Sequence, residues 1–160
     1  MTLERQIMSA KRLIPSEVSQ EIYRSVANID ALIRKSGFES DLIELVKVRA
    51  SQINGCAFCL DIHTRDARKS GVSEQKLYVL AAWEECDLFS PRERAALGWT
   101  DALTLVATTH ADDRHYEPLV AAFNEKEIVD LTFLIGLINL WNRLAIGMRY
   151  VVAPEPETRT

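Results

Sequence analysis

The stretch that decides the fold is Glu44–Arg68, ELVKVRASQINGCAFCLDIHTRDAR. Its first half continues a run in which apolar residues recur at helical spacings from Leu42 to Ile53, and Asn54-Gly55 then ends that helix. A further helix begins at about Cys56. The stretch therefore predicts a helical hairpin with a Cys-x-x-Cys pair at the start of its second arm.

Helical spacing recurs along the rest of the chain. No useful length of sequence alternates apolar and polar residues, and the 160 residues contain only six Gly and five Pro. We expect an all-α fold: a single compact helical domain of about six to seven helices, with the Cys pair at the N-terminus of a central helix. The expected helices cover residues 16–35, 40–54, 56–69, 73–81, 90–109, 116–123 and 124–149.

The expected domain occupies residues 1–152, and residues 153–160, which include two prolines and three charged side chains, are expected to form a disordered tail. Residues 43–54 weakly resemble residues 128–139, at a shift of 85 positions. This similarity fits two helical halves built on one plan, and it also fits chance.

Composition narrows the possible partners. The net charge is −4 and no Lys/Arg-rich block is present, so we expect no nucleic-acid partner. The N-terminus has no apolar signal-peptide core, and the most apolar run, Leu131–Trp141, is too short to span a bilayer. We expect a cytoplasmic protein without a membrane partner. In that reducing compartment, a close Cys pair is more often catalytic or metal-binding than structural.

The residues that carry chemistry are Cys56, Cys59 and His63, which share one face of a helix at spacings of three and four. A helix N-terminus favours the thiolate, the form that attacks a peroxide or a disulfide. His63 is placed to take a proton or to stabilise the anion. If the hairpin is antiparallel, Glu44 returns to the cysteines and orients the imidazole, as in other activated nucleophiles.

These residues resemble the alkylhydroperoxidase D family, within the carboxymuconolactone decarboxylase-like superfamily. The pattern is a Glu, eleven residues, then C-x-x-C-x-x-x-H followed by Ala-Arg, here Glu44, Cys56, Cys59, His63 and Ala67-Arg68. Residues 90–104 and 138–146 also resemble helices of that family, so the resemblance covers about residues 42–149.

The resemblance implies a thiol-dependent peroxidase that reduces small organic hydroperoxides. Cys59 is then the peroxidatic nucleophile, Cys56 resolves it, and Glu44 with His63 forms the proton relay. Thioredoxin logic would instead make Cys56 the attacking thiol, since it lies nearer the helix terminus. The family implies no cofactor and no metal, an external dithiol or a thioredoxin-like or lipoyl reductant, and a homo-oligomer, trimeric or hexameric.

Phe58 is a departure, because some family members have a histidine between the cysteines. It puts the rate and the preferred substrate of a peroxidase in doubt, so a disulfide reductase or redox sensor without significant peroxidase turnover stays open. A decarboxylase of the superfamily's other branch is disfavoured by the Cys pair. A zinc module would need a fourth ligand beside Cys56, Cys59 and His63, and the candidates are Cys86, His110 and His115.

Overall fold

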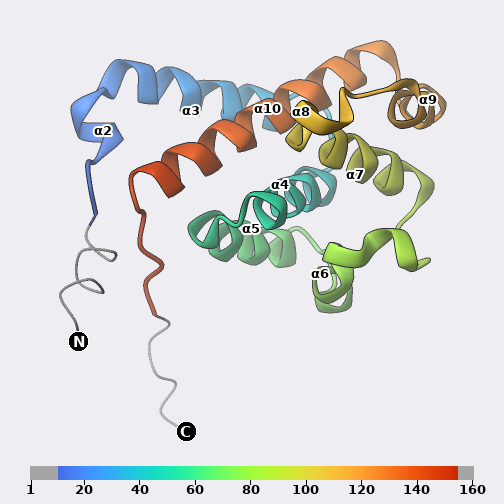
Figure 1. The fold of residues 1–160 in the computed structure, drawn as a ribbon, viewed down its shortest axis with the longest axis horizontal. Coiled ribbons are helices and arrows are strands. Elements are labelled where there is room, and N and C mark those ends of the chain that lie inside the picture. Colours follow the sequence, from blue (N-terminus) through green and yellow to red (C-terminus); the bar gives the residue numbers. More distant parts are fainter. Residues whose placement is uncertain (1–10, 155–160) are drawn as a thin grey trace, which may run out of the picture.

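The computed structural model describes residues 11–154, and within this part of the chain helices and short turns make up the fold (Figure 1). The helices are α2 (Pro15–Val18), α3 (Gln20–Arg34), α4 (Ser40–Asn54), α5 (Ala57–Lys69), α6 (Glu74–Val79), the 3-10 helix η1 (Leu80–Glu85), α7 (Pro91–Thr104), α8 (Val106–Thr109), α9 (Asp113–Ala122) and α10 (Glu125–Gly147). The prediction of an all-α fold is confirmed.

Helix α4 is the centre of the structure, since it packs against α5, α7 and α10 and most of its residues are buried. It ends at Gly55, whose φ of 67° lies in the left-handed region that glycine adopts without strain. The Cys56 N–H then donates to the Ser51 carbonyl, and Cys56 becomes the N-cap residue of α5. The predicted hairpin is therefore present, with the Cys pair at the start of its second helix.

Helix α10 begins with a capping box formed by Asn124 and Glu127 and extends alongside both α3 and α4 (Figure 1). Among the described residues it is the one helix long and apolar enough to cross a membrane. Half of its apolar window is buried inside the protein, and the core helix of a soluble protein meets the same criteria.

The predicted helices differ from the observed ones mainly at internal breaks. Ser19 and Leu105 have non-helical backbone angles, which separate α2 from α3 and α7 from α8. The fourth helix continues as η1, and α9 begins three residues before Tyr116. These short pieces account for the larger number of helices. Residues 1–10 and 155–160 lie outside the described part, so the domain limits and the disordered tail stay predictions.

Candidate redox site

Cys56 and Cys59 form a disulfide at the start of α5, with their Cα atoms 5.4 Å apart. The Cys59 N–H also donates to the Cys56 sulfur, at 3.4 Å, so this sulfur caps the helix. The two residues are only 1% and 5% exposed, and Ala145, Phe58 and Tyr150 pack against them. The redox pair is thus embedded in an apolar layer.

Glu44 and His63 meet across the α4–α5 hairpin, as the antiparallel arrangement requires. The Glu44 Oε2 atom lies 2.8 Å from His63 Nδ1, and the Glu44 side chain is fully buried. Because the carboxylate holds Nδ1, the imidazole keeps Nε2 for proton exchange with another group. The four residues expected to carry chemistry therefore lie in one neighbourhood at the hairpin.

A chain of alternating charges extends this pair onto α3. The other Glu44 oxygen, Oε1, lies 2.8 Å from an Arg34 guanidinium nitrogen, and Arg34 Nε donates to Asp30 at 2.9 Å. Asp30 also accepts from the buried Lys47 ammonium, at 2.5 Å. We call His63, Glu44, Arg34, Asp30 and Lys47 the ionic ladder.

The ladder keeps its acids ionised. Burial alone would raise the pKa of Glu44, but the hydrogen bond and charge of His63, with the charges of Lys47 and Arg34, outweigh it, so the pKa lies below its usual value. Burial would likewise raise the pKa of Asp30, and the hydrogen bonds and charges of Lys47 and Arg34 lower it. Burial opposes the charge of Arg34, but its two acidic partners raise its pKa.

Sequence reasoning missed the three ladder residues outside the motif: Asp30, Arg34 and Lys47. A signal for them did exist, since Asp30 and Arg34 are four residues apart on one predicted helix and Lys47 follows Glu44 by one turn. That signal is typical of any solvated helix face. Only the position of α3, which packs on α10 and reaches the hairpin through these ion pairs, turns it into part of the site.

A cavity of about 290 Å³ opens beside the disulfide. Cys59 and His63 both line it, whereas Cys56 does not. Its remaining lining includes both apolar and charged residues. The aromatic and aliphatic residues are Tyr23, Ala27, Phe58, Ile62, Trp141, Ala145 and Tyr150, and the charged residues are Asp30, Arg34, Lys47 and Asp66. Of the two cysteines, Cys59 is therefore the one that a small molecule in this cavity can reach.

Aromatic pairs form part of the apolar lining of the cavity. Phe58 packs edge-on against Tyr150, with 5.0 Å between ring centroids, and Tyr23 packs in the same way against Trp141, at 5.2 Å. Phe58 thus provides an apolar wall where some family members have a histidine. Trp141, from α10, also lines the cavity.

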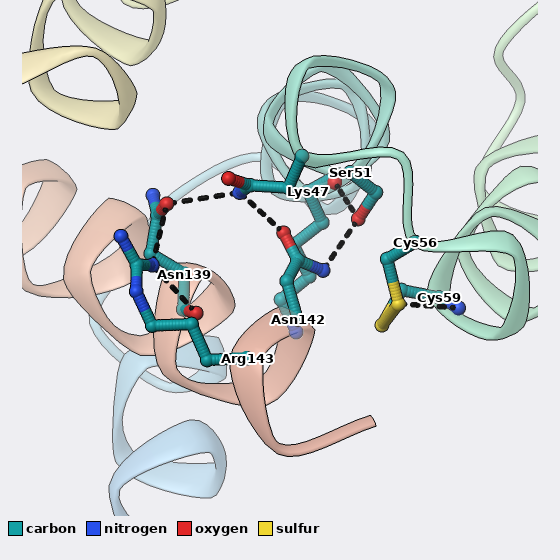
Figure 2. The surroundings of a disulfide bond; sticks show 8 residues. Lys47, Ser51, Cys56, Cys59, Asn139, Asn142 and Arg143 are labelled. Carbon is teal, nitrogen blue, oxygen red and sulfur yellow. Dashed lines mark hydrogen bonds between the residues drawn. A yellow bond between two sulfur atoms is a disulfide. The ribbon is translucent and has the colours of Figure 1, made fainter. Parts of the chain in front are cut away.

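A network of neutral polar side chains lies beside the Cys pair, between α4 and α10, and Arg143 donates to it at Asn139 Oδ1, at 3.0 Å (Figure 2). Asn54 donates to Asn139 and to Asn142, each at 2.9 Å, and Asn142 donates to the Ser51 hydroxyl at 3.0 Å. Ser51 is the residue whose carbonyl accepts the Cys56 N–H. We call Ser51, Asn54, Asn139 and Asn142 the amide network.

The described residues contain one group of three possible metal ligands: Glu44, His63 and Asp66, with ligand atoms within 4.8 Å of one another. It contains no cysteine, and Arg34 and Lys47 place positive charge next to Glu44. The ligand set considered for zinc is not brought together among the described residues. Cys86 is a partly buried free thiol, and Arg68 pairs with Glu74 on the surface.

Comparison with known proteins identifies the family. The family model described as "Carboxymuconolactone decarboxylase family" matches residues 20–102, a span that includes Glu44, both cysteines and His63. The chain belongs to the carboxymuconolactone decarboxylase family. Within this family it is AhpD-like, as its motif and its structural neighbour agree.

Three proteins illustrate what the chain is similar to. The uncharacterized protein YdfG of Bacillus subtilis is 40% identical over 87% of this chain and 95% of its own length. A crystal structure of a protein of unknown function from Agrobacterium tumefaciens, described as a candidate antioxidant defence protein AhpD, is 42% identical, with a TM-score of 0.88 over 91% of this chain and all of its own. The debrominase Bmp8 shares the fold, with a TM-score of 0.70 and 18% identity over 81% of this chain and 69% of its own.

Proposed function

We propose that this protein is a thiol-dependent peroxidase that reduces organic hydroperoxides by a Cys56/Cys59 dithiol–disulfide cycle. The observation that carries the proposal is the cavity, which exposes Cys59 and His63 to a small molecule and leaves Cys56 buried behind them. The Glu44–His63 contact of 2.8 Å supports a proton relay at the same place.

The proposed cycle starts with both thiols reduced. The Cys59 thiolate attacks the terminal oxygen of ROOH, the O–O bond breaks, and the leaving alkoxide takes a proton through His63 to give ROH and a Cys59 sulfenic acid. The Cys56 thiol then attacks the sulfur atom of the sulfenic acid and the disulfide forms. The hydroxyl group leaves together with the thiol proton as water. An external dithiol then reduces this disulfide by thiol–disulfide exchange. The dithiol gives up two electrons and becomes a disulfide, and both protein thiols are restored.

The test is consumption of cumene hydroperoxide with excess dithiothreitol by wild type, Cys59→Ser and Cys56→Ser. We expect turnover to be lost in both variants, and a sulfenic acid to be trapped by dimedone only in Cys56→Ser. A sulfenic acid on Cys56 in the Cys59→Ser protein would reverse the roles. Absence of wild-type turnover, with a disulfide that still cycles, would overturn the peroxidase proposal.

A redox sensor is the second candidate, because both cysteines are nearly inaccessible to a protein partner. The same burial disfavours a disulfide reductase that acts on protein substrates. A buried disulfide exchanges slowly, since the attacking thiolate must reach a sulfur atom. Stoichiometric disulfide formation with peroxide, followed by reduction that takes many minutes, would favour the sensor.

Because a dithiol–disulfide cycle needs a reducing compartment, we propose a cytoplasmic location.

We also propose that the chain self-associates. Large apolar side chains of α3 and α10 are exposed, among them Leu32 and Phe133, which lie on one groove. Exposed apolar area of this kind marks interaction surfaces. Light scattering of the purified protein tests this proposal, and a monomer at micromolar concentration would contradict it.

A further inference from the structure

We propose that the cavity beside Cys59 selects compact, uncharged hydroperoxides and disfavours anionic and long-chain ones. This inference deepens the proposed peroxidase function and rests on it. It follows from three properties of the cavity: the balance of its charges, the chemistry of its apolar lining, and its size.

The charges of the cavity are already paired. Four charged side chains line it, Asp30, Arg34, Lys47 and Asp66. Asp30 is bound by Lys47 and by Arg34, and Arg34 also contacts Glu44. Asp66 pairs with Lys69 at 2.8 Å.

With Glu44 and Lys69 included, three acids face three permanently charged bases, and His63, when it is protonated, is itself bound by Glu44, so no cation of the lining is unpaired. A carboxylate or phosphate that enters must lose its water, and no unpaired cation of the lining compensates for that loss. An uncharged hydroperoxide does not incur this cost. The ladder therefore acts against anions although three of its members are basic, because each of them is already paired with an acid.

The apolar part of the lining suits an organic group. Phe58, Ile62 and Trp141 present apolar surface next to Cys59, and the ring of Tyr150 closes the wall behind Phe58. Apolar contact of this kind stabilises a bound group by about 25 cal/mol for each Å² removed from water. A histidine at position 58 would remove part of this surface, so Phe58 is a residue that determines specificity toward the organic group.

The size of the cavity sets the third limit. Its volume of about 290 Å³ lies at the small end of ligand pockets, which typically enclose ~300–1,000 Å³. A tert-butyl or cumyl group fits such a space, whereas an eighteen-carbon chain has to extend out of it into solvent. Long-chain hydroperoxides therefore gain little from the aromatic wall.

The charge limit can be tested without any peroxide. In a Cys56→Ser/Cys86→Ser background, Cys59 is the one cysteine left in the chain. The probes are iodoacetamide and iodoacetate, which are similar in size and differ in charge, and the readout is the ratio of their alkylation rates. We expect this ratio to exceed that of N-acetylcysteine amide by about tenfold, the equivalent of one unfavourable charge contact.

Asp30→Asn sharpens the test because it frees Lys47 and Arg34 from their shared acid. We expect the ratio to fall by about threefold or more. Asp61→Asn is the matched control, since it removes the same charge from α5 at a residue that does not line the cavity. A ratio in the Cys56→Ser/Cys86→Ser parent protein equal to that of N-acetylcysteine amide overturns the proposal, whatever the folding of the Asp30→Asn and Asp61→Asn variants. An equal change in both variants also overturns it, because the net charge of the chain would then be the cause.

The size limit is tested with cumene hydroperoxide against the hydroperoxide of methyl linoleate, both uncharged. We expect cumene hydroperoxide to oxidise Cys59 about tenfold faster, and equal rates would overturn the size limit. If neither compound oxidises Cys59, the peroxidase proposal fails, and the alkylation ratio still decides whether the cavity excludes anions.

Discussion

One stripe of α4, formed by Glu44, Lys47, Ser51 and Asn54, places four polar residues in or beside the core, and its two halves have different chemistry. The first half is ionised and belongs to the ladder that reaches α3 and α5. The second half is neutral and binds α10 through amides beside the disulfide (Figure 2). Charged groups can exchange protons with a substrate, whereas neutral amides hold two helices in register at any ordinary pH. We therefore expect the ladder to control chemistry and the amide network to control stability.

The largest expected effect comes from Glu44→Gln, which keeps the shape of the side chain and removes its charge. His63 then loses the carboxylate that orients it and stabilises its protonated form. We expect kcat/KM for cumene hydroperoxide to fall by about 10²–10⁴-fold, the usual contribution of a general acid–base group. Asn142→Ala is the matched control from the amide network, and we expect it to change kcat/KM by about threefold or less while folded. A larger loss in Asn142→Ala than in Glu44→Gln would contradict the division between the two halves.

The amide network gives the reverse expectation for stability. In Asn142→Ala, the Asn54 amide and the Ser51 hydroxyl each lose a partner in the core. Asn54 still donates to Asn139 and Ser51 still donates to the Lys47 carbonyl, so we expect the free energy of unfolding to fall by about 0.5–1.5 kcal/mol for each lost hydrogen bond, measured by urea denaturation at pH 7. Asn28→Ala, on the exposed side of α3, is the control and should change stability by less than about 0.5 kcal/mol. An unchanged urea midpoint in Asn142→Ala would show that water replaces the lost contacts.

The sequence predicted the parts of this site that depend on local spacing. Gly55 ends α4 with a positive φ, and the Cys pair starts α5, as Asn54-Gly55 and the motif indicated. Glu44 could be assigned only from the motif, because a single helical glutamate usually faces solvent. It proved to be fully buried.

The partners from α3 and α10 could not be predicted from spacing. Asp30 and Arg34 have the pattern of an exposed i, i+4 ion pair, and Asn139 and Asn142 interrupt an apolar helix without indicating a partner. Their roles depend on how α3 and α10 pack against α4, which is a long-range contact. For the same reason, the wall formed by Phe58 and Tyr150, 92 residues apart in the chain, was not predicted.

The next prediction separates the charge of Arg34 from its packing. Arg34→Met removes a positive neighbour of Glu44, so the pKa of this acid should rise, and the acid limb of the pH–rate profile should move to higher pH by about one unit or less. Arg34→Lys restores the charge without the paired nitrogens and should recover part of the shift. Arg68→Met is the control, because Arg68 pairs with Glu74 on the surface. Equal profiles for Met and Lys at position 34 would mean that its charge has no role.

The smallest expected effect is the pH dependence of the ladder's stability. The pKa values of Asp30 and Glu44 lie below the ordinary values of about 3.8 and 4.5, so these acids stabilise the folded state fully above those values. The contribution is lost as the pH falls through the lowered values, because the unfolded chain then binds protons more readily. Urea denaturation of wild type and Asp30→Asn between pH 7 and pH 3 should show a difference in unfolding free energy that narrows below about pH 4. Asp61→Asn, in a more exposed ion pair, should show a small difference throughout. A difference between wild type and Asp30→Asn that stays constant down to pH 3 would mean that Asp30 stabilises the fold by packing alone.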